Sequence, residues 1–416
     1  MNAPYPNTAA RQPRAWPVAL ALLFVCGALY ALTAALLGRW GSPDSAYFNL
    51  LADAFLHGRL GLSNPPATVD LAPFNGAWYV PFPPLPALLL LPWVAVAGVA
   101  RVSTVLFGAV VGGANVALAF LLLDALARRD WSKLGREGNL WLTALFAVGS
   151  VHWYMSTLGS VWFLAQLCTV TFMLAAAWSA VATGSALLAG AMLAVAMLAR
   201  PHVALCYPLL LAIGIQHAAA RPGGLSARRL ASWAAVLAAP LALSGGLLLA
   251  YNKLRFGNPL DFGYLRQNVA RELAADLLLY GQFNLRYVPH NLWAMLLAGP
   301  VWNVARRQVV PTIDGMSLLI TTPALIYLAR ARQRSALAIG AWLALALLLV
   351  PLLTYYNTGW WQFGYRFSLD FMTPVLVLLA LAAGARVSAT MRALIVLGVL
   401  VNAWGCWWFL NPRFFA

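Results

Sequence analysis

Apolar runs separated by short polar segments recur along almost the whole of this 416-residue chain, from Trp16 to Leu410. An α-helix of about 20 apolar residues crosses the hydrocarbon core of a bilayer, so runs of this kind predict transmembrane helices. The pattern predicts an all-α fold: a polytopic transmembrane helical bundle of about eleven spans, forming a single domain. The expected spans are residues 16–37, 102–127, 140–153, 162–181, 185–199, 202–217, 230–251, 316–330, 335–353, 372–385 and 393–410.

A further apolar run, residues 82–100, does not fit this series of crossings. If it crossed, the basic cluster that begins at Arg128 would lie on the opposite side from the first helix's N-terminus, against the usual charge bias. The segment leading into it is rich in proline, at Pro81, Pro83, Pro84 and Pro86. We expect a half-helix or interfacial helix in the outer leaflet. Irregular backbone at that depth must be covered by protein or face water, which indicates a cavity.

Composition excludes a water-soluble protein, because 62% of the residues are hydrophobic and only 9% are charged. About a quarter of the residues in an ordinary soluble domain are charged. The four cysteines lie in or beside apolar runs and far apart, a spacing that matches neither a disulfide framework nor a metal site. They are Cys26, Cys168, Cys206 and Cys406.

The net charge of +16 is explained by where the basic residues fall. They cluster in short segments between apolar runs, as in cytoplasmic loops, so they give no reason to expect a nucleic-acid partner. The first run has no convincing cleavage site and is expected to remain as an uncleaved helix with a cytoplasmic N-terminus. The clusters are Arg11 and Arg14; Arg128, Arg129, Lys133 and Arg136; Arg221, Arg228 and Arg229; Arg330, Arg332 and Arg334; and Arg386 with Arg392.

Three long loops remain for the outer side: the first loop (residues 38–81), the second loop (252–315) and the third loop (354–371). Long loops of specific composition are where function usually resides. These three contain most of the acidic side chains of the chain, namely Asp44, Asp53, Asp70, Asp261, Glu272, Asp276, Asp314 and Asp370.

The first loop contains a predicted amphipathic helix that begins near Tyr47 and ends at His57-Gly58, lying on the membrane surface. Asp44 precedes this helix. Its carboxylate would either cap the helix N-terminus or accept a proton from an incoming hydroxyl group, and the sequence favours neither over the other.

Arginines beside aromatic residues in the second and third loops suit a lipid phosphate or pyrophosphate, since a guanidinium group binds phosphate oxygens in bidentate fashion. Alternatives remain open at this stage. The aromatic residues would also fit an interfacial belt. Arg366 would also fit an ion pair with Asp370, four residues later. Arg200, at the outer end of two short spans, would reach either the phosphate or the membrane surface.

Several of these segments resemble, in the same order along the chain, the GT-C superfamily of polytopic membrane glycosyltransferases. The resemblance is to the bacterial protein O-mannosyltransferase-like (glycosyltransferase 39-like) branch. The segments are Asp44-Ser45-Ala46-Tyr47; Tyr79-Val80-Pro81-Phe82-Pro83-Pro84-Leu85-Pro86; Leu198-Ala199-Arg200-Pro201; Tyr251-Asn252 with Arg255-Phe256-Gly257; and Gln362-Phe363-Gly364-Tyr365-Arg366.

The resemblance implies transfer of a hexose or pentose from a polyprenyl-phosphate donor to an acceptor hydroxyl of a glycan, lipid or protein, with inversion. The reaction would take place at the outer face of the bacterial cytoplasmic membrane. Asp44 takes the place of the family's catalytic base, and juxtamembrane helices are expected in the first loop. The implied substrate-binding residues are Tyr47, Arg200, Arg255, Tyr264, Arg266, Gln362, Tyr365 and Arg366.

The sequence departs from the family at Ser45, where many relatives carry a second acidic residue. A divalent metal prefers several oxygen ligands, so a metal is not favoured, and we expect no cofactor. No soluble domain is expected after the last span. Two other functions are a lipid-linked sugar flippase or transporter, and a non-catalytic membrane scaffold. The flippase or transporter function is disfavoured, because ionisable residues are rare at the centres of the expected spans.

Overall fold

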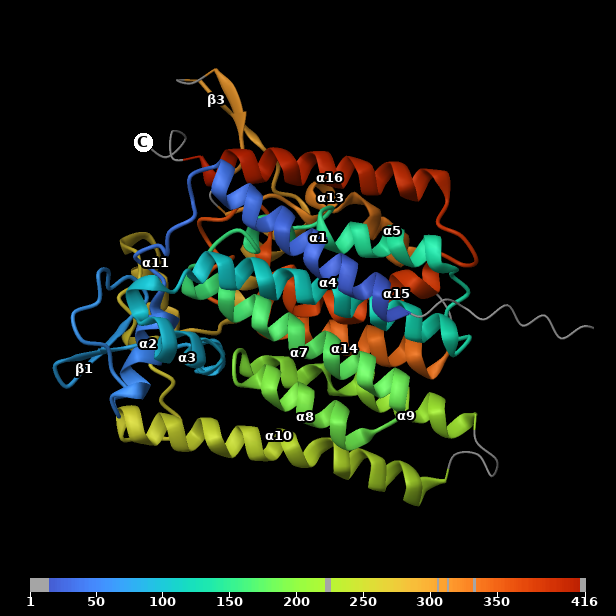
Figure 1. Cartoon of the computed structure of the whole chain (residues 1–416), viewed down its shortest axis with the longest axis horizontal. Helices are drawn as coiled ribbons and strands as arrows, with labels where there is room; N and C mark the ends of the chain where they lie inside the picture. The colour runs from blue at the N-terminus through green and yellow to red at the C-terminus, as the bar shows by residue number, and fades with distance from the viewer. Residues whose placement is uncertain (1–14, 221–225, 305–306, 313, 332–333, 412–416) are drawn as a thin grey trace, which may run out of the picture.

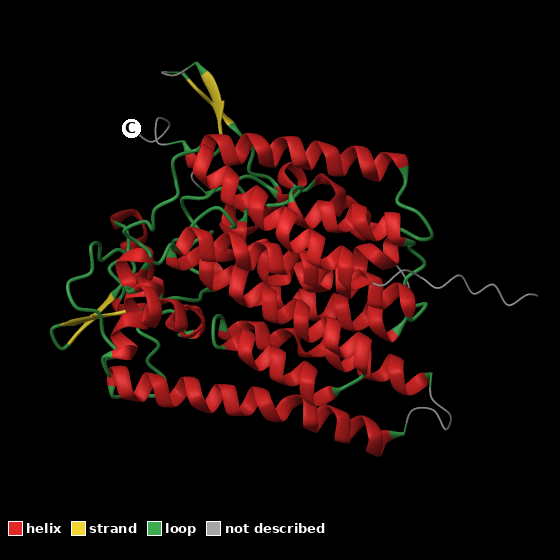
Figure 2. Ribbon diagram, in the orientation of Figure 1, coloured by secondary structure: helices red, strands yellow, loops and turns green. Residues whose placement is uncertain are grey.

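The computed structural model describes residues 15–220, 226–304, 307–312, 314–331 and 334–411. Four basic residues that were assigned to the cytoplasmic side, Arg11, Arg14, Arg221 and Arg332, lie outside the described residues, as does the end of the chain. The long helices of the described chain form a bundle and run roughly along one common direction, with two small hairpins at one end (Figures 1 and 2). The prediction of an all-α polytopic bundle is confirmed.

Seven helical segments of the described chain are long and apolar enough to cross a membrane. Each contains the greater part of one expected span, so the periodic apolar pattern located them well. They are α1 (Ala15–Leu36), α4 (Thr104–Arg128), α7 (Val161–Thr183), the segment Pro201–Ala219 with α9 (Tyr207–Ala219), α10 (Ala227–Phe256), α14 (Ala336–Leu353) and α16 (Ala389–Leu410).

The other four expected spans are short or interrupted helices. They are α5 (Arg136–Ala147) with α6 (His152–Met155); α8 (Ala186–Met197); α13 (Leu318–Thr321) with the 3₁₀ segment Pro323–Arg330; and the 3₁₀ segment Arg366–Phe371 with α15 (Met372–Ala382). Pro323 explains one interruption, because a proline disfavours helical backbone in the residue before it. The freed carbonyl of Thr321 accepts a hydrogen bond of 2.6 Å from Asn402.

Small residues allow the long helices to pack closely, as is common in membrane bundles. A Cβ atom at Gly113 of α4 would overlap the backbone of α1 at Leu23 and Gly27. The central helices α4 and α7 are mostly buried, whereas only a minor part of α1 and α10 is buried.

The three long loops gather at one end of the bundle, and the turns α4–α5 and α15–α16 lie at the other (Figure 1). The first loop contains the predicted amphipathic helix, α2 (Tyr47–Leu56), whose chain reverses at Gly58 with a φ of +68°. The run at residues 82–100 is the short helix α3 (Leu85–Ala97) followed by a 3₁₀ turn, Val99–Arg101, in agreement with a half-helix. The hairpin of β1 (Ala72–Phe74) and β2 (Ala77–Tyr79) lies between α2 and α3.

The second loop contains α11 (Arg271–Tyr280), α12 (Val288–Leu296) and two 3₁₀ turns, Tyr264–Arg266 and Leu285–Tyr287. It also contains the hairpin of β3 (Val301–Asn303) and β4 (Gln308–Val310). Its start pairs with the first loop: the amide of Asp70 donates to Asn268 O and the amide of Asn268 donates to Leu71 O, both at 2.9 Å. These bonds join segments about 200 residues apart.

Candidate functional site

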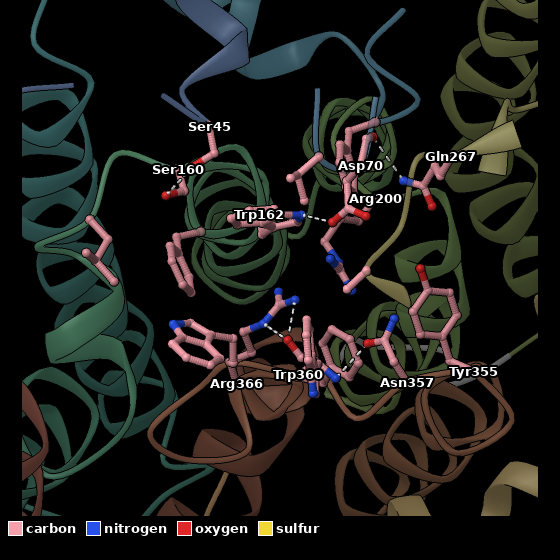
Figure 3. A pocket seen from close by; sticks show the side chains of 18 of the residues that line it. Ser45, Asp70, Ser160, Trp162, Arg200, Gln267, Tyr355, Asn357, Trp360 and Arg366 are labelled. Carbon is pink, nitrogen blue, oxygen red and sulfur yellow. Dashed lines mark hydrogen bonds between the residues drawn. The ribbon is translucent and has the colours of Figure 1, made fainter. Parts of the chain in front are cut away.

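A cavity of about 880 Å³ lies at the loop-bearing end of the bundle. Its wall comes from the first loop, the start of α7, the segment after α8, and parts of the second and third loops. Asp70, Arg200 and Arg366 come from three of these regions and point into the same space (Figure 3). The expectation of a covered cavity beside the 82–100 segment is met, because Phe82 is one of the lining residues.

Arg366 supplies a buried cation to this cavity. Its Nε and Nη2 donate to the carbonyl oxygen of Gly359 at 3.0 and 2.9 Å (Figure 3). Its Nη1 donates to Gln166 Oε1 at 2.9 Å. All these acceptors are neutral, and no carboxylate of the described chain lies within 4.0 Å of the guanidinium nitrogens. An arginine that is oriented but lacks a carboxylate partner is suited to an anionic ligand.

The alternative ion pair between Arg366 and Asp370 is wrong. Asp370 Oδ2 instead lies 2.8 Å from Arg200 Nη2 and 3.2 Å from His202 Nε2, and Gln166 donates to its Oδ1 at 3.2 Å. Residues 366–371 form a 3₁₀ helix, in which residues four apart do not lie on one face as they do in an α-helix. Asp370 therefore holds Arg200 at the cavity wall and leaves Arg366 without a carboxylate partner among the described residues.

Asp70 supplies a carboxylate to the opposite wall. Trp162 Nε1 donates to its Oδ2 at 2.8 Å (Figure 3). Burial raises the pKa of Asp70 to about 6, although the hydrogen bond from Trp162 and the charge of Arg366 both oppose the increase. Such a carboxyl group exchanges a proton close to neutral pH.

Asp44, the predicted base, is exposed. Both its neighbours, Pro43 and Ser45, line the cavity, but Asp44 does not. The helix-capping alternative is wrong, because α2 begins after Ala46 and no side chain caps its N-terminus. The role of Asp44 as a base stays a prediction.

The structure brings three of the predicted substrate-binding residues together at the cavity: Arg200, Tyr264 and Arg366. Tyr47 lies behind the wall and donates to Val69 O at 2.9 Å. Gln362 lies within the third loop and accepts a hydrogen bond from the amide of Arg366 at 3.0 Å.

The remaining predicted residues lie away from the cavity wall. Arg255 is buried against the first loop and donates to Val80 O at 2.6 Å, and Tyr365 is fully buried. Arg266 is exposed and forms an ion pair of 2.9 Å with Asp261.

Sequence reasoning missed several lining residues that the structure adds to this site. From the sequence, Asp70 is expected only as one of the acidic side chains of the outer loops, and residue 162 only as the start of a span. Tyr355, Tyr356 and Asn357 belong to the third loop, and the sequence predicts no individual role for them. The sequence gives one indication of these residues: charged side chains that stand among apolar residues, as in Val69-Asp70-Leu71 and Arg200-Pro201-His202.

Tyrosines around Asp70 keep their protons at neutral pH. Burial raises the pKa of Tyr264, Tyr355 and Tyr356, and the nearby charge of Asp70 raises each of them further. Their hydroxyl groups are therefore available as hydrogen-bond donors. Among the residues that the structure describes, no three His, Cys, Asp or Glu side chains are grouped as a metal site.

No protein-family model and no curated protein matches the sequence. Among solved structures, the chain is similar to ArnT from Cupriavidus metallidurans bound to undecaprenyl phosphate, with 15% identity and a TM-score of 0.47. ArnT in the apo state gives 16% identity and a TM-score of 0.46. Both alignments cover 89% of this chain and 58% of the ArnT chain, so this chain spans less than two thirds of ArnT.

The chain is also similar to the Archaeoglobus fulgidus oligosaccharyltransferase in complex with Zn and sulfate. That comparison gives 13% identity and a TM-score of 0.45, over 94% of this chain and 52% of the other.

Proposed function

We propose that this protein is a GT-C-type membrane glycosyltransferase that moves a sugar from a polyprenyl-phosphate donor to an acceptor hydroxyl. The observation that carries the proposal is the buried Arg366, which points into a cavity of about 880 Å³ without a carboxylate partner. A lipid phosphate would supply the missing negative charge. The motifs around Asp44, Arg200 and Arg366 support the same family.

In the proposed reaction, the bond between the anomeric carbon of the sugar and the donor phosphate oxygen breaks as the acceptor oxygen attacks the same carbon. The electron pair of the broken bond passes to the phosphate, whose charge Arg366 and Arg200 stabilise. The acceptor proton passes to a carboxylate of the first loop. Attack from the face opposite the phosphate inverts the configuration.

The membrane location fits such a donor. The polyprenyl chain would remain among lipids while its phosphate enters the cavity at the end of the bundle. We place the site on the outer face of a bacterial cytoplasmic membrane, because the basic turns of the described chain lie at the other end. The acceptor is a hydroxyl-bearing glycan, lipid or protein.

The test uses membranes that carry the wild-type chain or Arg366→Gln, supplied with radiolabelled undecaprenyl-phosphate hexoses and pentoses. Donor consumption and released undecaprenyl phosphate are both measured. Removing one group that stabilises developing charge typically lowers the rate by about 10²–10³-fold. The matched control is Arg286→Gln, an exposed arginine of the second loop that stacks over Tyr280 outside the cavity and is expected to keep wild-type transfer.

Each other outcome has a definite meaning. Wild-type rates of transfer by Arg366→Gln would show that Arg366 takes no part in the reaction. If the wild type consumes no donor, the transferase proposal is wrong. Movement of intact donor across the bilayer would then favour the flippase alternative, and binding without consumption or movement would favour the scaffold.

A further inference from the structure

Asp70 has the position of a reacting group rather than of a structural one. Its side chain points into the cavity with Arg200 and Arg366 (Figure 3), and it is one of the lining residues. Within the described chain, its carboxylate receives a single side-chain hydrogen bond, from Trp162 Nε1 to Oδ2 at 2.8 Å. The second oxygen, Oδ1, remains available to a ligand in the cavity.

The backbone of Asp70 is held in a rarely adopted conformation. Its φ is +60°, in the left-handed region that an aspartate adopts at a cost in energy. The second loop maintains this conformation through the paired backbone bonds at Asn268 and through Gln267, which donates to Asp70 O at 3.3 Å. Strained backbone of this kind persists where surrounding structure fixes it, and it is concentrated at functional sites.

The surroundings of Asp70 also suit proton transfer. The charged and titratable groups around Asp70 are four tyrosines, two arginines and a histidine that shares the cavity: Tyr47, Tyr264, Tyr355, Tyr356, Arg200, Arg366 and His202. The pKa of each of the four tyrosines is raised, so they titrate well above neutral pH, and the arginines stay charged. A carboxyl group with a pKa of about 6 therefore changes its charge near neutral pH, whereas these tyrosines and arginines keep theirs.

Asp44 contrasts with Asp70 in each of these respects. It is exposed, lies outside the set of lining residues, and has a negative φ. The structure gives its carboxylate neither a hydrogen bond nor an ion pair within the described residues. No polar contact with another described residue therefore orients the Asp44 carboxylate.

We propose that Asp70 is the catalytic base, and that Trp162 is a positioning residue that holds it. This inference rests on the proposed transfer reaction. The acceptor hydroxyl gives its proton to Asp70 Oδ1 as its oxygen bonds to the anomeric carbon, and the phosphate leaves with the electron pair of the broken bond. The proton then passes from Asp70 to water at the cavity mouth.

The test measures the pH dependence of kcat and KM for donor consumption in wild type, Asp70→Asn, Asp70→Glu, Asp44→Asn and Trp162→Phe. Asp70→Asn is expected to lower kcat by about 10²–10⁴-fold with little change in KM, and Asp70→Glu to restore part of it. Trp162→Phe removes a hydrogen bond that lowers the pKa of Asp70, so the acid limb of kcat/KM should move to higher pH.

The shift of the acid limb in Trp162→Phe shows whether Trp162 positions Asp70 or only packs beside it. A loss of packing alone would lower the rate without moving the acid limb of kcat/KM. It also separates Asp70 from His202, another lining residue, which is hydrogen-bonded to Asp370 and not to Trp162. Asp44→Asn should keep the wild-type position of the acid limb. Asp53→Asn is the matched control, because Asp53 lies on α2 near His57 and Arg59, outside the cavity.

An unchanged acid limb in Trp162→Phe, or wild-type kcat in Asp70→Asn, would overturn the assignment of Asp70. So would loss of the acid limb in Asp44→Asn, which would return the role of base to Asp44. These outcomes all require an active wild type, so they differ from a wild type that consumes no donor, which would overturn the proposed function itself.

Discussion

Arg366 donates two hydrogen bonds to the carbonyl oxygen of Gly359, seven residues earlier in the chain, at 3.0 and 2.9 Å. The third loop thus folds back on itself and aims the guanidinium group at the cavity. Gly359 has a φ of +106°, and a Cβ atom there would lie 2.6 Å from Gln362 Oε1 and 3.1 Å from Arg366 Nε. The orientation of Arg366 therefore depends on the absence of a side chain at position 359.

Gly359→Ala is expected to weaken binding of undecaprenyl phosphate at least about 10-fold, because Arg366 must turn away from its present direction. Binding of undecaprenol, which lacks the phosphate, should be unaffected. Both affinities can be measured on the purified protein in nanodiscs. The control is Gly245→Ala on α10, where a Cβ atom would meet open space. Equal weakening for both lipids would show that the variant disturbs the fold and not the phosphate site.

Asp370→Asn should destabilise the protein strongly, because Arg200 would remain buried with reduced compensation. Removal of one partner from a buried ion pair typically costs about 3–5 kcal/mol. Thermal unfolding in detergent measures the change. Asp261→Asn, which breaks the more exposed pair with Arg266, should cost less than about 1 kcal/mol. A similar small effect for both variants would contradict the structural role of Asp370.

Asp70 should make the stability of the fold depend on pH. Its pKa in the folded protein, about 6, is above the reference value of 3.8, so the folded state binds this proton more tightly than the unfolded state does. The resulting stabilisation is complete below about pH 4 and is lost as pH rises through about 6. Asp70→Asn should remove this dependence, a difference of at most about 3 kcal/mol. The test is to measure the unfolding midpoints of the wild type and Asp70→Asn between pH 4 and pH 8. If the midpoints of the two proteins change with pH in the same way, Asp70 does not cause the dependence.

Tyr47→Phe should loosen the segment that carries Asp70, because the lost hydroxyl group donates to Val69 O at 2.9 Å. The expected loss of stability is about 1 kcal/mol. We expect kcat to fall by roughly 3–10-fold with KM unchanged, because the base is held less firmly. A change confined to KM would instead indicate that Tyr47 contacts the substrate.

The helical architecture could be predicted from the sequence because the length of each apolar run and the basic residues of each turn can be read from a short stretch of the chain. Even the short helix α3 could be predicted, from the prolines that precede it and because one more crossing would put the following basic cluster on the wrong side of the membrane. The site was only partly predictable. Arg255 and Arg366 are next to aromatic residues in the sequence and Arg266 is two residues after Tyr264, so only their partners in the fold distinguish the three arginines. Those partners are Val80, Asp261 and Gly359, which no local pattern reveals.

Two errors have clear physical causes. The pairing of Arg366 with Asp370 assumed an α-helix where the backbone is 3₁₀. The importance of Asp70 was missed because its position depends on backbone bonds to Asn268, about 200 residues later. A loop residue whose geometry is fixed by such a remote contact carries little local signal.

The same backbone bonds link the wall that carries Asp70 to α10, which leads into the second loop. Arg255, near the end of α10, holds the first loop a second time, at Val80. With 30 residues α10 is about 45 Å long, well beyond the roughly 30 Å thickness of the hydrocarbon layer. A helix of that length tilts according to the thickness of the surrounding bilayer. A change in lipid acyl-chain length should change the tilt of α10 and thereby shift the loop segment that carries Asp70. The turnover rate should therefore depend on the thickness of the membrane in which the protein resides.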